Sequence, residues 1–390
     1  MFEVMEEVRP HGAVIKVIGV GGCGSNAVDH MLVHGVKGVE FICANTDLQA
    51  LKRSQAPTQL QLGAGITRGL GAGANPDVGR QAAIEDRERI VELLTGTDML
   101  FLTAGMGGGT GTGAAPVVAE IAKELGILTV AVVTKPFAFE GRRQKIALQG
   151  IEALTPHVNS LIMVANDKLI QVLGNQVKFD EACRAANDVL HGAVAGIAEI
   201  ISCPGMINVD FADVRTVMSE TGVAMMGSAR AAGTDRARMA AEQAVACPLL
   251  DDIDIADARG VLVNISASKD SFQMQEVYDV MGVVDEFTAE SATKIIGTVY
   301  DDALDDELRV TIVATGLGSK LPASRPQSKP LAVVAATGTD DRTPAPDAID
   351  YSELDRPAVI RHNRAETIEA MRRSGVEVLD IPAFLRKQAD

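Results

Sequence analysis

The run GMGGGTGTG, from Gly105 to Gly113, decides how this sequence is interpreted. It follows the apolar run MLFLT at 99–103 and precedes a stretch, 116–125, that we expect to be a helix opened by Pro116. A packing requirement can explain one glycine at such a junction, but not six glycines and two threonines within nine residues. Free backbone N–H groups and hydroxyls at a helix amino end suit a polyphosphate. The run therefore predicts a phosphate-binding loop.

Two more glycine-rich loops lie upstream. GVGGCGSN at 19–26 follows an apolar strand and contains G-x-G-x-x-G, with Asp47 at a suitable distance beyond it. Alone, this loop fits a dinucleotide-binding dehydrogenase equally well. The other loop is GLGAGANP at 69–76. A dinucleotide-binding half needs one such loop and this chain has three, while the absence of G-x-x-x-x-G-K-[ST] excludes a P-loop NTPase.

The first half of the chain alternates short apolar runs with helical stretches. The runs are nearly all apolar, as strands covered on both faces must be. They lie at 13–18, 39–44, 99–103, 128–133 and 160–165. Helix candidates, including 76–94 and 116–125, lie between them. This alternation predicts an α/β fold with a doubly wound, mostly parallel sheet.

A long helix and a different pattern follow. Apolar residues recur at three- and four-residue steps across 180–202, and Pro204 stops the helix. The next hundred residues predict a smaller α+β domain. Its expected helices are 211–218 and 235–246, and its expected strands are 261–266, 292–299 and 308–315.

The chain ends in a polar, proline-punctuated segment and an apolar tail. The tail DIPAFLRKQAD, Asp380 to Asp390, suits a docking peptide, although a frayed terminus is the simpler interpretation of its pattern alone. The predicted organisation is therefore a flexible N-terminus (1–12), a nucleotide domain (13–178), a central helix (179–203), an α+β domain (204–317), a disordered linker (318–374) and a C-terminal peptide (375–390).

Composition narrows the function. The net charge is −16, from 36 basic and 52 acidic residues, which disfavours nonspecific binding to nucleic acid or anionic lipid. Five widely spaced cysteines indicate a reduced, cytoplasmic protein. The six histidines show no H-E-x-x-H or other ligand spacing, so no metal-ligating residue is predicted. The acidic N-terminus is no ordinary signal peptide, and no apolar run can span a bilayer.

Six motifs in order carry a family resemblance. They are GVGGCGSNAV, NTDLQAL, GLGAGANPDVGR, GMGGGTGTGAAPVVA, TKPFAFEG and NVDFADVRTVM. Together they resemble FtsZ, the bacterial tubulin-like division GTPase family, from about residue 13 to residue 318, and the tail resembles that family's C-terminal peptide. The resemblance implies a tubulin-like fold, GTP as substrate, Mg²⁺, head-to-tail homopolymers, action at midcell, and tail binding to membrane tethers of the FtsA and ZipA type.

The resemblance also implies a nucleotide site. Matching positions are Gly21, Gly22, Cys23, Gly24, Ser25, Asn26, Ala72, Gly73, Gly107, Gly108, Gly109, Thr110, Gly111, Thr112, Gly113, Glu140, Arg143 or Gln144, Asn187 and Asp188. Two positions depart from the family pattern. Cys183 stands where a guanine-stacking phenylalanine is usual, and Gln144, with Arg143 beside it, stands where an arginine is common. Loss of a stacking ring costs on the order of 1 kcal/mol.

Asn208, Asp210 and Asp213 form the candidate catalytic set. On spacing alone, Asp210 and Asp213 are better explained as the cap and first turn of a helix. The resemblance reverses that preference, because these positions match a loop that enters the neighbouring subunit's nucleotide site. There a carboxylate and an amide would orient the attacking water, which is the main requirement of phosphoryl transfer to water.

Three functions therefore stand at this point. A polymerising GTPase that hydrolyses GTP where subunits meet explains all six motifs. A weakly or non-hydrolysing tubulin-like scaffold would account for Cys183 and Gln144. An NAD-dependent oxidoreductase rests on the first glycine loop alone, and no catalytic histidine or tyrosine constellation supports it.

Overall fold

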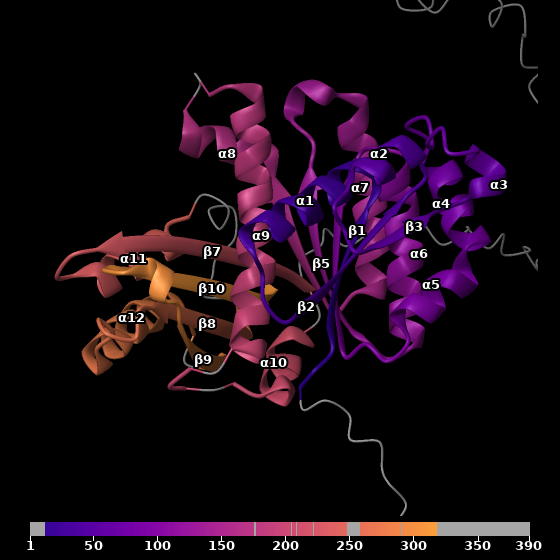
Figure 1. Ribbon diagram of the computed structural model, residues 1–390. Coiled ribbons are helices and arrows are strands. Elements are labelled where there is room, and N and C mark those ends of the chain that lie inside the picture. The colour runs from indigo at the N-terminus through magenta and orange to yellow at the C-terminus, as the bar shows by residue number, and fades with distance from the viewer. Residues whose placement is uncertain are drawn as a thin grey trace, which may run out of the picture. The chain divides into compact units, whose positions relative to one another are not determined.

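One mixed sheet organises the computed structural model, which describes residues 12–174, 177–203, 205–207, 209–220, 222–247, 258–289 and 291–317 (Figure 1). Its strand order is β3-β2-β1-β4-β5-β6-β7-β10-β8-β9. The strands are β1 (Ile15–Val20), β2 (Val39–Asn45), β3 (Thr58–Gln61), β4 (Met99–Gly105), β5 (Leu128–Lys135), β6 (Ser160–Ala165), β7 (Gly222–Ala232), β8 (Gly260–Ala267), β9 (Thr293–Tyr300) and β10 (Glu307–Leu317).

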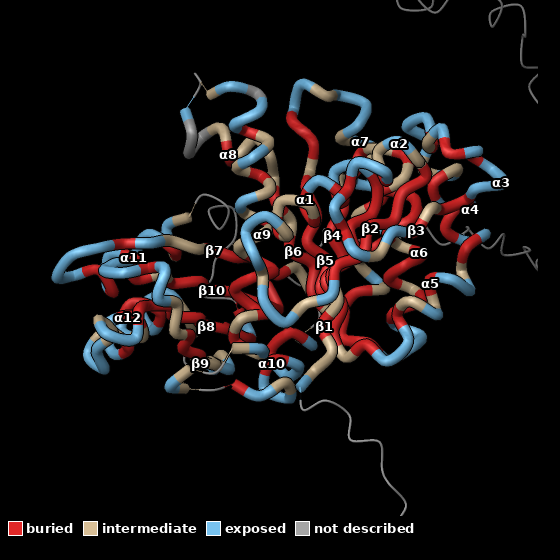
Figure 2. Tube along the Cα trace, viewed as in Figure 1, coloured by how far each residue is buried: buried red, intermediate tan, exposed pale blue. Residues whose placement is uncertain are grey.

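The strands from β3 to β7 pair in parallel. Helices cover both faces of this part, and its central strands β1, β4 and β5 are buried along nearly their whole length (Figure 2). In β1, for example, Val17 packs on one face and Ile18 on the other. The helices here are α1 (Gly21–His34), α2 (Leu48–Arg53), α3 (Ala64–Thr67), α4 (Pro76–Glu85), α5 (Arg87–Leu94), α6 (Thr110–Glu124), α7 (Arg142–Leu154) and α8 (Asn166–Leu173). The doubly wound sheet predicted from the apolar runs is confirmed.

The long helix α9 (Phe179–Ser202) joins the two halves of the sheet. Its buried residues Leu190, Val194 and Ile197 lie in one hydrophobic cluster with Met31 of α1, strand residues of the parallel half, and Val313 of β10. The helix spans about 36 Å at 1.5 Å per residue. At its far end lies α10 (Phe211–Met218), whereas α8 lies beside its beginning (Figure 1).

The second half of the sheet is antiparallel where β10 pairs with β7 and β8, and parallel where β8 pairs with β9. Helices α11 (Arg236–Val245) and α12 (Met274–Phe287) pack on it around a cluster that includes Ala240, Ile265 and Val310. The buried Arg236 guanidinium pairs with Glu276, with Nε 2.6 Å from Oε1, and thereby ties α11 to α12.

Most predicted elements are present. The five predicted strands of the first half have ends shifted by at most two residues, and α10 has its predicted bounds. The predicted helix at 76–94 is wrong as one helix: it breaks at Asp86, whose carboxylate accepts a hydrogen bond from the Gly63 amide at 2.7 Å. The helix expected to open at Pro116 opens at Thr110, within the glycine run.

Several elements were not predicted from the sequence, β7 and α12 among them. Strand β7 is built largely of glycine, alanine, serine and methionine, so it lacks the β-branched pattern of a strand. Helix α12 carries four valines and Gly282, which weaken its helical signal. The predicted linker (318–374) and tail (375–390) lie outside the described residues, as does Asn208. Among described residues, no helix is long and apolar enough to cross a bilayer.

Candidate functional site

Two helices begin at the same edge of the sheet. Strands β1 and β4 are parallel neighbours, so their carboxyl ends lie together. Helix α1 begins at Gly21 directly after β1, and α6 begins at Thr110 shortly after β4. The first turn of a helix leaves backbone N–H groups unpaired and carries the positive end of the helix dipole. Two such ends side by side make an anion site.

Glycine is required where these loops meet. Gly21 has a φ of 75°, and a Cβ there would lie 2.9 Å from the backbone nitrogen of Gly111. The second loop joins the same junction, because a Cβ on Gly109 would lie 2.8 Å from the backbone nitrogen of Asn75. All three glycine-rich loops therefore come together, and their backbones approach more closely than side chains allow.

Threonine hydroxyls fix the shape of the third loop. Thr112 Oγ1 accepts a hydrogen bond from the Gly107 amide at 2.8 Å. Thr110 Oγ1 lies 2.6 Å from Thr46 Oγ1, at the end of the neighbouring strand β2. The loop is thus held by its own side chain and by an adjacent strand, which presets its amides for a ligand.

A cavity of about 270 Å³ opens at this junction. It is lined by Val20, Gly21, Gly22, Cys23, Gly105, Met106, Gly108, Gly109, Thr110, Gly111, Thr134, Pro136, Glu140, Arg143 and Asn166. Backbone amides and hydroxyls dominate one side of it, as a phosphate chain requires. The first and third loops, which the sequence analysis singled out separately, thus share one cavity.

The other side of the cavity carries an ion pair. Arg143 Nη1 donates to Glu140 Oε2 at 2.8 Å, and Glu140 Oε1 accepts from the Phe137 amide at 3.1 Å. Of the two residues that the sequence left as alternatives, Arg143 lines the cavity, and Gln144 is not among the lining residues. Arg143 is the more exposed member of the pair, so its guanidinium is free to turn toward a ligand.

Asn166 also lines the cavity, and the sequence analysis missed it. Its Oδ1 is buried without a hydrogen-bond partner among the described residues, which marks an acceptor that a ligand's N–H or O–H group can satisfy. Its position was detectable in principle, because Asn166 follows β6 at the same edge of the sheet as the glycine loops.

The other predicted nucleotide residues do not line the cavity. Ala72 packs against Gly109, which brings the second loop beside the third. The remaining ones outside the lining are Gly24, Ser25, Asn26, Gly73, Gly107, Thr112, Gly113, Asn187 and Asp188. Asp188 is turned toward α1, where its carboxylate lies 3.1 Å from His30 Nε2. Cys183 is half-buried, and burial, followed by the charges of Asp180 and Glu140, raises the pKa of its thiol.

The predicted catalytic acids lie on α10. Asp210 caps this helix, since its Oδ1 accepts a hydrogen bond from the Asp213 amide at 2.8 Å. Both residues are exposed. The hydrogen bond confirms the capping interpretation for Asp210. Helix α10 lies at the end of α9 remote from α8 (Figure 1), and neither acid lines the cavity of its own chain.

Two families of known domains match the chain. Residues 14–174 match the Tubulin/FtsZ family GTPase domain, and residues 222–318 match the FtsZ family C-terminal domain. The cell division protein FtsZ of Pseudomonas aeruginosa is 56% identical over 402 residues, covering 100% of both chains. This chain belongs to the FtsZ family.

Further FtsZ proteins agree with this assignment. The cell division protein FtsZ of Coxiella burnetii is 57% identical and covers 99% of each chain. A solved empty FtsZ dimer from M. jannaschii superposes with a TM-score of 0.75 at 41% identity, over 79% of this chain and 89% of that one. As a member of the FtsZ family, the chain is a tubulin-like GTPase of cell division, and none of these relatives supports the oxidoreductase alternative.

Proposed function

We propose that this FtsZ-family chain, a polymerising GTPase of cell division, binds the GTP phosphates in the cavity between the first turns of α1 and α6. The single observation that carries the proposal is the meeting of two helix amino ends and three glycine loops at one edge of the sheet. Phosphates accept hydrogen bonds from unpaired amides there. Glu140, Arg143 and Asn166 on the other side then contact the ribose and base.

Mg²⁺ fits this cavity as a companion of the nucleotide. Mg²⁺ keeps several waters and binds through one or two protein oxygens plus substrate phosphates. Of the carboxylates in the described part of the chain, Glu140 alone lines the cavity, and it pairs with Arg143, so Thr110 Oγ1 and the phosphates are the better ligands. The ion would neutralise phosphate charge during hydrolysis.

Hydrolysis takes place where two subunits meet. Asp210 and Asp213 are exposed at the far end of α9, about 36 Å of helix from its beginning. A neighbour stacked head to tail brings them onto the next subunit's GTP. The two carboxylates, with Asn208, then orient the attacking water, while the glycine loops hold the phosphates.

A competition experiment tests the nucleotide assignment. A fluorescent guanine nucleotide should bind purified protein to saturation, with displacement by GTP but not by ATP or NADH, and phosphate release should accompany light scattering upon addition of GTP. The reason is that the loops form a phosphate cradle and supply no residue for hydride transfer. Tight NADH binding, or binding of GTP without phosphate release by filaments, would contradict the proposal.

Cys183→Phe should tighten GTP binding. Cys183 lies in the second turn of α9, close enough to Glu140 for that carboxylate's charge to act on its thiol. An aromatic ring there would stack on guanine, and about 1.4 kcal/mol would lower the Kd roughly tenfold. Equilibrium titration measures the change, with Cys247→Phe, in the other half of the chain, as the matched control. An unchanged Kd would mean that another group already covers the base.

The C-terminal peptide, Asp380 to Asp390, binds membrane tethers of the FtsA and ZipA type and so places the polymer at midcell. More than fifty residues by count, the predicted linker, precede it, and a flexible linker of that length would let the peptide reach partners independently of the polymer. Deleting it should leave GTP-driven assembly nearly intact and abolish recruitment to tether-coated vesicles. Sedimentation of filaments with and without such vesicles measures both. Loss of assembly itself would contradict a pure docking role.

A further inference from the structure

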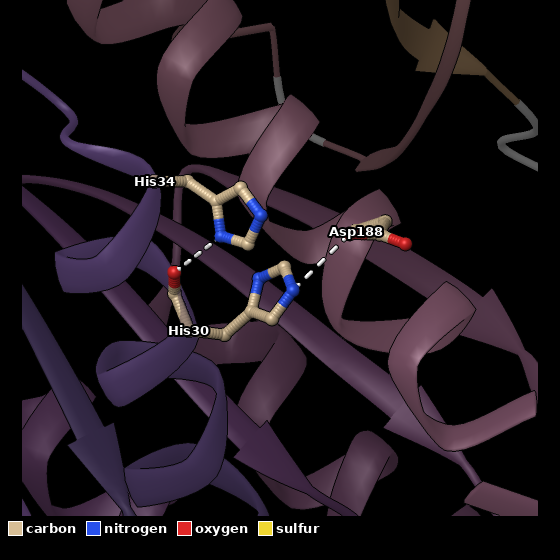
Figure 3. Close-up of side chains that lie close together, drawn as sticks. All are labelled: His30, His34 and Asp188. Carbon is tan, nitrogen blue, oxygen red and sulfur yellow. Dashed lines mark hydrogen bonds and ion pairs between the residues drawn. The ribbon is translucent and has the colours of Figure 1, made fainter. Parts of the chain in front are cut away.

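Two histidines of α1 and an aspartate of α9 form a cluster outside the phosphate cavity (Figure 3). His30 and His34 are one helical turn apart, so they share a face of α1. Asp188 reaches them from α9, with Oδ1 3.1 Å from His30 Nε2. One ligand atom from each of the three residues lies within 4.8 Å of the other two.

Hydrogen bonding leaves ring nitrogens of this cluster available. His34 Nδ1 lies 2.8 Å from the His30 backbone carbonyl, which only accepts hydrogen bonds, so Nδ1 carries the proton and Nε2 keeps its lone pair. The ring of His34 lies 4.1 Å, centroid to centroid, from that of His30. His30 Nδ1 is buried and has no partner among the described residues. These are the features of imidazoles ready to bind a cation.

The surroundings of the cluster allow a positive ion. His191 of α9 lies beside both rings, with its ring centroid 6.2 Å from that of His30 and 5.4 Å from that of His34. Arg184 is a positively charged neighbour of His30, and the Asp188 carboxylate opposes its charge. The exposed Asp188 and His34 are also free to adjust their rotamers.

We propose that His30, His34 and Asp188 bind a divalent transition-metal ion, Zn²⁺ above all, that ties α1 to α9. Two imidazoles and one carboxylate are a zinc ligand set, whereas Mg²⁺ and Ca²⁺ prefer oxygen ligands alone. Metal–ligand bonds of about 2.1 Å place tetrahedral ligands roughly 3.4 Å apart. The three ligand atoms thus need to close by at most about 1.4 Å from the 4.8 Å limit. Water completes the fourth position.

The ion would act on the frame of the nucleotide site. Helix α1 begins at the phosphate loop, and α9 is the helix that connects both halves of the sheet. A metal bridge between them resists their separation, so it stabilises the folded chain by binding it in preference to the unfolded chain. This stabilisation requires no nucleotide. Zinc binding by nucleotide-free protein and GTP binding are therefore tested by separate measurements, and either result can be negative without the other.

Zinc titration of the full-length, chelator-treated, nucleotide-free protein tests the site. Calorimetry should find one Zn²⁺ per chain that His34→Ala loses and that His157→Ala, a matched loss of one imidazole elsewhere, keeps. At a free Zn²⁺ concentration of a hundred times Kd, Tm should rise by about 4 °C in the wild type and not in His34→Ala. Mg²⁺ at the same concentration should leave Tm unchanged.

Two further variants, His30→Ala and His34→Gln, separate loss of metal binding from misfolding, and circular dichroism checks that each variant is folded. Co²⁺ should give tetrahedral d–d absorption in the wild type and in His157→Ala, and all three cluster variants should lose it. Equal Zn²⁺ stoichiometry and Tm shift in wild type and folded cluster variants would overturn the proposal, as would a wild type that binds no zinc.

Discussion

Asp213→Ala is expected to bind GTP with near-normal affinity and to lose about 100-fold or more of its hydrolysis rate, the scale of a lost water-orienting group. Its side chain is exposed in the first turn of α10 and does not line the cavity of its own chain. Since the proposed GTP cavity and the proposed catalytic acid lie on different parts of the chain, GTP affinity and hydrolysis rate should change independently. Filaments should persist, because GTP that is not hydrolysed does not trigger disassembly.

Two variants control for the structure of α10. Asp210→Asn removes the charge but keeps a side-chain oxygen that can cap the helix. A loss of hydrolysis in this variant would therefore come from the missing charge and not from a damaged helix end. Asp235→Ala removes an exposed acid at the start of α11 that makes no capping hydrogen bond, so it should hydrolyse GTP normally. If a strictly monomeric preparation hydrolysed GTP at the same rate per molecule as filaments, a site shared between two subunits would be refuted.

Local sequence patterns predicted most of the helices and strands of the parallel half. The apolar runs predicted the parallel strands because a strand buried on both faces must be apolar throughout. The glycine run predicted a phosphate-binding loop because free amides and hydroxyls at a helix amino end suit a polyphosphate, and the structure places this run at the start of α6. Strand β7 was missed because its pairing partners, not its own small residues, make it a strand. Strand β7 pairs with β6 on one side and β10 on the other, so it joins into one sheet the two halves that the sequence predicted as separate domains.

The site was less predictable than the fold. Asn166 was missed because a single asparagine after a strand has no motif, and its burial appears only once β5 and β6 pair. The choice between Arg143 and Gln144 depends on which one faces the cavity, which spacing does not determine. The cluster of His30, His34 and Asp188 joins residues more than 150 positions apart, so the sequence search for ligand spacing did not find it.

Gly108→Val is expected to weaken GTP binding by at least about 100-fold and, on its own, to lose GTP-driven assembly and hydrolysis with it. Gly108 lines the cavity, and a Cβ there would meet no protein atom within 4 Å. The folded chain therefore tolerates the added side chain, which instead occupies the space of the phosphates. Displaced phosphates lose charge-assisted hydrogen bonds of about 1.5–3 kcal/mol each, and two such bonds account for the expected loss.

Gly282→Ala is the matched control for Gly108→Val. Gly282 also has open space around its Cβ position, but it lies exposed in α12, away from the cavity. Alanine there should leave GTP binding unchanged and stabilise the helix by roughly 0.5–1 kcal/mol. Mixing Gly108→Val with Asp213→Ala should restore part of the hydrolysis, because some junctions then pair an intact cavity with intact carboxylates. No gain on mixing, with both variants shown to co-assemble, would mean that cavity and carboxylates act within one chain.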